Sequence, residues 1–269
     1  MSNPNPKATE DFYICLDLTI NPLIRFIFHQ YCLSKHSKSK TAKVLNHRLL
    51  HELFSSTYSS KFMSVETNFT AVILAGGKSS RFGTDKALIP IGDKYLIELI
   101  LSQLLLKFKN IIISSNKPEV FKQLEVPVIK DVYQNFGPLG GIHSALVHSK
   151  TEFCFITACD MPFINLDMVD YLVNYYPKKG VLVPFAEGRI QPLFAVYRKS
   201  LIPKIEEVLA GKYESKFLAL HNFIKLVESE VVDVTKEKFY TPLTFYNINT
   251  IEDFEKVQNL LTEFYKSKF

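Results

Sequence analysis

Residues 71–87, AVILAGGKSSRFGTDKA, combine glycines, hydroxyls and positive charges directly after a short apolar run. The adjacent Gly76 and Gly77 let backbone N–H groups face an anion with no side chain in the way. Neutral donors and fixed positive charges follow, on Ser79, Ser80, Arg81 and Lys86. This composition predicts a loop that binds the phosphates of a nucleotide. The alternative is a flexible surface loop whose charges are solvated.

The spacing of the glycines excludes two common nucleotide-binding loops. A Walker A motif needs a glycine five residues before Gly77, and Val72 stands at that position. The GxGxxG fingerprint also fails, because Gly76 and Gly77 are adjacent. The loop therefore indicates neither an ordinary P-loop protein nor a dinucleotide-binding fold.

A second group of residues, CDMPF at 159–163, ends the most continuously apolar run of the chain, EFCFITA. A carboxylate on Asp160 at the end of a central strand can hold Mg²⁺, which in turn bridges phosphate oxygens. The alternative for Asp160 is a turn or helix-capping aspartate. Cys159 fits a buried strand thiol.

A third segment, DVYQNFGPLGGIHSAL at 131–146, is rich in glycine and precedes a predicted helix. Its glycines allow close approach of a ligand, and the start of the helix presents free N–H groups. Asp131 lies at a strand edge, where its carboxylate could accept hydrogen bonds from a ribose or a base. His143 is a candidate base, although the pattern favours a histidine on the helix face.

The segments between these groups alternate between the patterns of strands and helices. Predicted strands are 69–75, 110–115, 126–131, 152–160, 180–185, 192–197, 231–234 and 245–248. Predicted helices are 95–108, 118–124, 140–148, 166–175, 199–210, 215–225 and 250–265, the last opened by a capping box, Thr250-x-x-Asp253. This alternation predicts an α/β fold with a mostly parallel sheet. Ligands bind beyond the carboxyl ends of such strands, where the three groups fall.

Charge and composition exclude several other classes of protein. Of the net charge of +5, residues 1–62 carry +4, from eight basic and four acidic side chains. The other 207 residues hold 24 basic and 23 acidic side chains, so a nucleic-acid backbone is not the expected partner. No run of ~18 uncharged apolar residues indicates a membrane span. The four cysteines lack CxxC spacing, which favours reduced thiols in a cytoplasmic protein.

Residues 1–62 differ from the rest and carry no evident chemistry. An apolar stretch at 12–33 is followed by a polar one at 35–43, which fits amphipathic helices or, less well, a helix on a membrane surface. Acidic residues precede the apolar stretch, so a secretory signal is not expected. We expect two parts, an extension over 1–62 and a catalytic domain over 63–269, with Met63 as a functional start.

These segments together resemble the molybdenum cofactor guanylyltransferases, a family of nucleotidyltransferases with a Rossmann-like, three-layer α/β/α fold of the GT-A type. The resemblance covers roughly residues 69–265, and nothing carries over to the extension. Phe82 stands where the family usually has methionine. The resemblance rests on LAGGKSSRFGTDKAL (74–88), SSNKPE (114–119), DVYQNFGPLGGI (131–142), CDMPF (159–163), QPLFAVY (191–197) and NINTIEDF (247–254).

The resemblance implies a role for each matching residue. Binding of GTP is implied for Leu74, Ala75, Gly76, Gly77, Lys86, Asn116, Asp131 and Asp160. Catalytic roles are implied for Lys86, Arg81 and Asp160, with Mg²⁺ on Asp160. Contact with the second substrate is implied for Gln191, Asn247 and Asn249, although Asn249 could instead help to cap the last helix.

The implied reaction is transfer of GMP from GTP to the phosphate of molybdenum-bearing molybdopterin, with release of pyrophosphate. Other proteins of cofactor assembly are the implied partners. Because the phosphate loop does not read the base, cytidylyl or uridylyl transfer to a pterin, sugar or polyol phosphate stays open. A non-catalytic nucleotide-binding protein of the same fold is a further alternative, as is an assembly partner whose extension docks other proteins.

Overall fold

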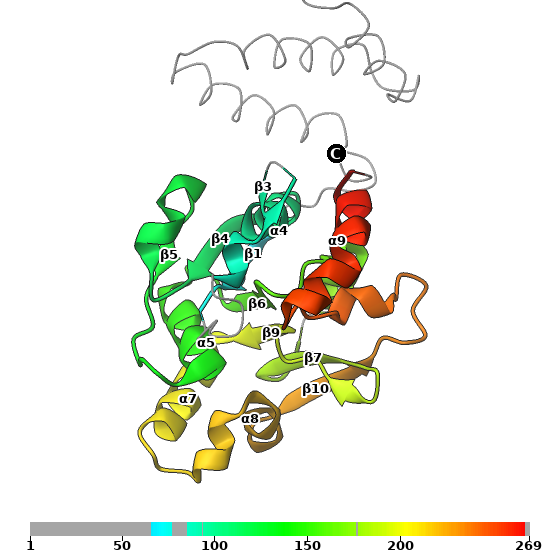
Figure 1. Ribbon diagram of the computed structural model, residues 1–269. Helices are drawn as coiled ribbons and strands as arrows, with labels where there is room; N and C mark the ends of the chain where they lie inside the picture. Colours follow the sequence, from blue (N-terminus) through cyan, green and yellow to red (C-terminus); the bar gives the residue numbers. More distant parts are fainter. Residues whose placement is uncertain (1–65, 77–84, 93, 176, 267–269) are drawn as a thin grey trace, which may run out of the picture. The chain divides into compact units, whose positions relative to one another are not determined.

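A mostly parallel sheet forms the centre of the described part of the chain (Figure 1). Its eight strands are β1 (Glu66–Leu74), β4 (Phe108–Ser114), β5 (Val128–Ile129), β6 (Phe153–Ala158), β7 (Val181–Ala186), β8 (Arg189–Ile190), β9 (Phe194–Arg198) and β10 (Ser229–Asp233). They lie in the order β10-β7-β9-β6-β1-β4-β5, and β8 pairs with β7. A separate antiparallel hairpin joins β2 (Pro90–Ile91) and β3 (Lys94–Tyr95).

The computed structural model describes residues 66–76, 85–92, 94–175 and 177–266. All of them belong to one compact unit, Ser64–Phe269. The predictions made for residues 1–62, and for the part of the glycine loop over 77–84, lie outside the described residues.

The directions of the strands bring several carboxyl ends to one edge of the sheet. β1 runs parallel to both β4 and β6, β4 to β5, and β7 to β10. β9 runs antiparallel to its neighbours β6 and β7, so those two strands point the same way. The carboxyl ends of β1, β4, β6 and β7 therefore share an edge, and the predicted α/β class is confirmed.

β1 is apolar on both of its faces, and helices accordingly cover both faces of the sheet. Its alternate residues Phe69, Ala71 and Ile73 belong to one buried cluster, and Val72 and Leu74 belong to the other. The helices are α4 (Leu96–Leu104), α5 (Gly137–His148), α6 (Leu166–Asn174), α7 (Ile202–Leu209), α8 (Leu220–Leu226) and α9 (Ile251–Lys266). The first cluster includes side chains of α4, α6 and α9, and the second those of α5, α7 and α8. Within the described ranges, none of these helices is long and apolar enough to cross a membrane.

Five short 3-10 helices connect these elements, and one of them corrects a prediction. They are η1 (Lys86–Leu88), η2 (Pro118–Leu124), η3 (Lys199–Leu201), η4 (Ser215–Leu218) and η5 (Pro242–Phe245). The strand predicted over 245–248 is wrong, because η5 ends there and the chain then continues without joining the sheet. The N–H of Ile248 donates to the carbonyl of Asp160 instead, at 2.9 Å. A single backbone hydrogen bond to Asp160, just after β6, is thus found where strand pairing was expected.

The predicted capping box at the start of α9 is confirmed. The N–H of Asp253 donates to Thr250 Oγ1 at 3.1 Å, and the N–H of Thr250 donates to Asp253 Oδ2 at 2.9 Å. The same Oδ2 accepts from the N–H of Asn249 at 3.0 Å. These backbone donors, the Asn249 N–H foremost, lower the pKa of Asp253. The carboxylate thus satisfies two N–H groups at a helix terminus.

The first turn of α5 requires glycine at one position. A Cβ placed on Gly140 would lie 2.7 Å from the carbonyl oxygen of Tyr133, far inside contact distance. The backbone oxygen cannot rotate away as the end of a flexible side chain can. Close packing of α5 against the preceding loop therefore depends on the missing side chain.

We expect Gly140→Ala to destabilise the protein by about 1–3 kcal/mol, the range typical of overpacking. Urea denaturation should show the loss as a lower midpoint. Gly76→Ala is the matched control, since a Cβ at Gly76 meets nothing within 4 Å. Equal midpoints for the two variants would contradict the packing argument.

We also expect a pH-dependent difference in melting temperature between the wild type and Asp253→Asn. Because the folded-state pKa of Asp253 is lowered, its charge stabilises the fold above the ordinary aspartate pKa, about 3.9. That stabilisation is lost as the pH falls through the lowered value. Thermal melts at pH 7 should therefore separate the two proteins, and melts near pH 2 should bring them together. A gap that widens on acidification would refute the assignment.

Candidate active site

Three of the predicted segments begin at the same level of the sheet. In the register of the parallel strands, Leu74 pairs with Ser114 of β4 and with Ala158 of β6. Just beyond, the Ala75 N–H donates to the Ser114 carbonyl at 2.9 Å, and the Cys159 N–H donates to the Leu74 carbonyl at 3.1 Å. The chain segments that begin with the glycine loop, with SSNKPE (114–119) and with CDMPF (159–163) therefore leave the sheet side by side.

Of the glycine loop, only the two ends belong to the described residues. Leu74 and Ala75 are buried, whereas Gly76 is exposed with open space beside its Cα. The predicted residues Gly77 and Arg81 lie outside the described residues. After the loop, Asp85 Oδ1 accepts a hydrogen bond from the Ala87 N–H at 3.2 Å and caps η1. This cap sets the backbone from which the Lys86 side chain projects.

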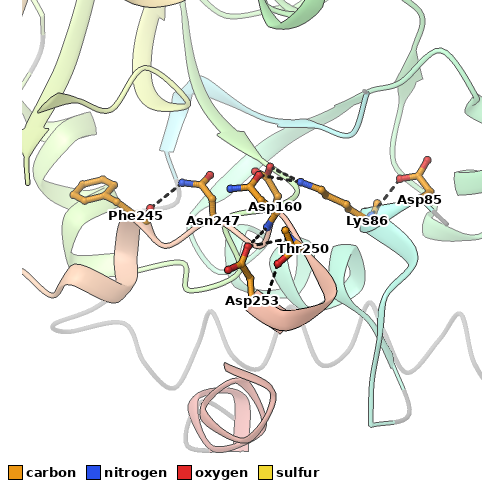
Figure 2. Close-up of polar contacts among 9 residues, drawn as sticks. Asp85, Lys86, Asp160, Phe245, Asn247, Thr250 and Asp253 are labelled. Carbon is orange, nitrogen blue, oxygen red and sulfur yellow. Dashed lines mark hydrogen bonds and ion pairs between the residues drawn. The ribbon is translucent and has the colours of Figure 1, made fainter. Parts of the chain in front are cut away.

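Lys86 joins residues that are distant in the sequence (Figure 2). Its ammonium group lies 3.4 Å from Asp160 Oδ2 and donates to Asn249 Oδ1 at 3.2 Å. The structure thus brings together two predicted catalytic residues and one residue predicted to face the second substrate. Lys86 and Asp160 are mostly shielded, with 19% and 23% of their side chains exposed, so their charges are less screened than surface charges.

The second carboxylate oxygen of Asp160 fits a metal ligand. Asp160 Oδ1 is buried and has no hydrogen-bond partner among the described residues, an unfavourable state for a charged oxygen unless a cation or donor reaches it. No cluster of three or more His, Cys, Asp or Glu side chains that could hold a metal occurs among the described residues. Mg²⁺ commonly binds through one or two carboxylates together with phosphate oxygens. Asp160 therefore suits a metal ion that arrives with a nucleotide.

Asn116 and Asp131 form a reciprocal pair beside β4. Asn116 Nδ2 donates to Asp131 Oδ2 at 2.9 Å, and the Asp131 N–H donates to Asn116 Oδ1 at 3.0 Å. Ser114 Oγ donates to Asp131 Oδ1 at 3.2 Å. Both carboxylate oxygens are thus held, and each keeps a lone pair for a further donor.

Two serines that position this pair were not predicted from the sequence. Ser114 is 3% exposed beneath Asp131. Ser144 of α5 accepts from the Val132 N–H at 2.7 Å and donates to the Gly140 carbonyl at 2.9 Å, which ties the loop after Asp131 to the helix. An isolated serine in an apolar strand or helix carries no recognisable signal, because only its neighbours in space define its role.

Two reactive side chains near the site are unsuited to chemistry. His143 is 1% exposed, with Nε2 3.2 Å from Glu206 Oε1 and its ring edge-on to Tyr133. It therefore belongs to the packing of α5 rather than to a solvent-facing base. Burial, followed by the charge of Asp160, strongly raises the pKa of the Cys159 thiol. The thiol stays protonated and is a poor nucleophile.

The three residues predicted for the second substrate lie in different environments. Gln191 is 5% exposed, and its Nε2 donates to the Ala186 carbonyl at 3.3 Å. Asn247 is half-buried, and its Nδ2 donates to the Phe245 carbonyl at 3.0 Å (Figure 2). Asn249 is exposed and contacts Lys86. Of the three, Asn249 alone bonds to a charged site residue in the described part of the chain.

Comparison with known proteins agrees with this arrangement. Residues 71–227 match the MobA-like NTP transferase domain. A probable molybdenum cofactor guanylyltransferase from Clostridium perfringens is 41% identical over 187 residues, which cover 69% of this chain and 94% of that protein. The molybdenum cofactor guanylyltransferase of Syntrophotalea carbinolica is 36% identical, over 70% of this chain and 89% of the relative.

A solved structure supports the fold. The molybdopterin-guanine dinucleotide biosynthesis protein A of Archaeoglobus fulgidus superposes with a TM-score of 0.61 at 22% identity, over 72% of this chain and 99% of the other. The matched domain and the two sequence relatives show the family: the chain belongs to the MobA-like NTP transferases.

Proposed function

We propose that this protein transfers GMP from GTP to the terminal phosphate of molybdenum-bearing molybdopterin and releases pyrophosphate. The observation that carries the proposal is the meeting of Lys86 with Asp160 beside the glycine loop, in a chain that aligns along almost all of two guanylyltransferases. An ammonium group and a carboxylate at the carboxyl edge of a parallel sheet suit the binding of a nucleotide with its metal ion.

The reaction itself needs no protein nucleophile. An anionic phosphate oxygen of molybdopterin attacks the α-phosphorus of GTP, a new P–O bond forms, and the bond to pyrophosphate breaks. Because the attacking oxygen is already ionised, no strong base is required. This agrees with the burial of His143 and Cys159, neither of which faces solvent.

Catalysis then rests on positioning and charge. Among the described residues, the Lys86 ammonium group is placed to bind the triphosphate. Asp160 Oδ1 is the oxygen suited to hold Mg²⁺. When bound there, Mg²⁺ would offset charge on the phosphates and on the leaving pyrophosphate. Asn116 and Asp131 are assigned to the guanosine part, where the two carboxylate oxygens of Asp131 can accept from N–H or O–H groups.

We also propose a domain organisation and a location for the reaction. Residues 63–269 contain the catalytic domain, and residues 1–62 are not needed for turnover. The reaction takes place in the cytoplasm, where other proteins of cofactor assembly deliver molybdopterin and receive the product.

The deciding experiment incubates the full chain with Mg²⁺, molybdenum-loaded molybdopterin and GTP, CTP, ATP or UTP in turn. The dinucleotide product is identified by mass. Product with GTP alone supports the proposal. Product with CTP alone would support the mechanism but refute guanine as the base that is transferred. No product with any nucleotide would refute molybdopterin as the acceptor. The assay is then repeated with residues 63–269.

We expect Asp160→Ala to lower kcat by about 100-fold or more, the usual loss when a group that stabilises a charged transition state is removed. Circular dichroism should show a folded protein. Asp167→Ala, on the exposed first turn of α6, is the control and should keep normal turnover. Near-normal turnover of Asp160→Ala would exclude a role for this carboxylate.

We expect Lys86→Ala to weaken GTP binding by roughly 10-fold or more, because a hydrogen bond to a charged group contributes ~1.5–3 kcal/mol. Turnover should fall as well. Isothermal titration with GTP measures the first effect. Lys225→Ala removes an exposed lysine of α8 and should leave GTP affinity unchanged. Equal affinities for the wild type and Lys86→Ala would contradict the assignment.

A further inference from the structure

We infer that Asp253 is a positioning residue for the proposed reaction: through Asn249 it holds the ammonium group of Lys86 beside Asp160. This inference rests on the proposed function. Asp253 itself lies one link away from the site, since its carboxylate and N–H bond to the backbone of Asn249 and to Thr250, and its carbonyl accepts from the Tyr246 hydroxyl at 3.5 Å. It therefore acts through other residues rather than on the substrate.

The first link fixes the backbone of Asn249. Asp253 Oδ2 accepts from the Asn249 N–H at 3.0 Å and from the Thr250 N–H at 2.9 Å. One carboxylate oxygen thus holds two successive peptide groups. The return bond from the Asp253 N–H to Thr250 Oγ1 closes the capping box and ties both peptides to the first turn of α9 (Figure 2).

The second link fixes the same segment from the other side. The N–H of Ile248 donates to the carbonyl oxygen of Asp160 at 2.9 Å, and the Ile248 side chain is fully buried. Asn249 therefore lies between Ile248, whose N–H is bonded to Asp160, and Thr250, whose N–H is bonded to Asp253. A short segment anchored at both ends leaves the Asn249 side chain few directions in which to point.

The third link reaches Lys86. Asn249 Oδ1 accepts from Lys86 Nζ at 3.2 Å, whereas Asp160 Oδ2 lies 3.4 Å from the same nitrogen. The Lys86 side chain is long and flexible, so two acceptors define its position better than one. The Asn249 carboxamide is neutral and orients the ammonium group without cancelling the charge that a phosphate needs. A cation on Asp160 would compete for that carboxylate but not for Asn249.

The test is a double-mutant cycle on the full-length protein, with GTP affinity and steady-state kinetics as readouts. Asp253→Ala and Asn249→Ala should each weaken GTP binding, measured without molybdopterin, and lower kcat/KM by about tenfold. That is less than the ~100-fold loss that a 1 Å misplacement can cause. In the double variant, the loss should equal that of Asn249→Ala alone, because both changes break one chain of contacts.

Glu98→Ala is the matched control. Glu98 Oε2 accepts from the Tyr95 N–H at the start of α4, so its removal deletes a comparable cap on a different helix from the one that holds the Asn249 backbone. Both Glu98→Ala and Asp253→Ala should lower the melting temperature by a few degrees, ~2–4 °C for a domain of this size. Glu98→Ala should leave GTP affinity and kcat/KM unchanged. An equal loss of activity in Glu98→Ala would show a general effect of destabilisation and overturn the inference.

Two further results would overturn it: wild-type GTP affinity and kcat/KM in Asp253→Ala, or a double variant whose loss is the product of the two single losses.

Failure of the proposed function would give a different result. In that case the wild type makes no dinucleotide product with any nucleotide, and the cycle is read from GTP affinity alone. Because that titration contains no molybdopterin, a loss of affinity in Asn249→Ala cannot arise from contact with the second substrate.

Discussion

Parallel pairing of β1 with both β4 and β6 is the constraint on which the rest of the site depends. The register that sets Leu74 opposite Ser114 and Ala158 makes three chain segments leave the sheet at one level. Backbone bonds from Ala75 and Cys159 continue the pairing one residue beyond the strands. A shift of one residue would turn each strand's side chains to the opposite face and would remove Phe69 and Ile73 from the cluster in which they are packed.

The position of Lys86 shows how the site is completed by elements outside that register. Its backbone follows the cap made by Asp85, and its ammonium group lies between Asp160 at the end of β6 and Asn249 before α9. The segment that leads into the C-terminal helix is therefore part of the site, although it adds no strand to the sheet. Its capping box connects the stability of a helix terminus to the orientation of a charged side chain.

The acidic groups of the site are arranged for different tasks. Asp131 has both oxygens held by neutral donors, Ser114 and Asn116, which suits recognition of a polar ligand. Asp160 has one oxygen near Lys86 and one that is buried without a partner among the described residues, which suits a cation. An aspartate side chain thus suits hydrogen bonding to a ligand in one place and a cation in the other, and the neighbouring donors make the difference.

Local sequence by itself determined the strands and helices that carry the site, and the identity of many of its residues. Short apolar runs predicted β1, which a glycine follows, and β6, and the Thr250-x-x-Asp253 pattern predicted the start of α9, because these signals depend on residues within a few positions of each other. The motifs at 71–87, 131–146 and 159–163 likewise indicated a nucleotide site. Only the tertiary structure decided that the segment over 245–248 leaves the sheet, that Ser114 and Ser144 support Asp131 and its loop, and that Asn249 meets Lys86. Those outcomes depend on contacts between residues up to 163 positions apart, and no local pattern encodes such a distance.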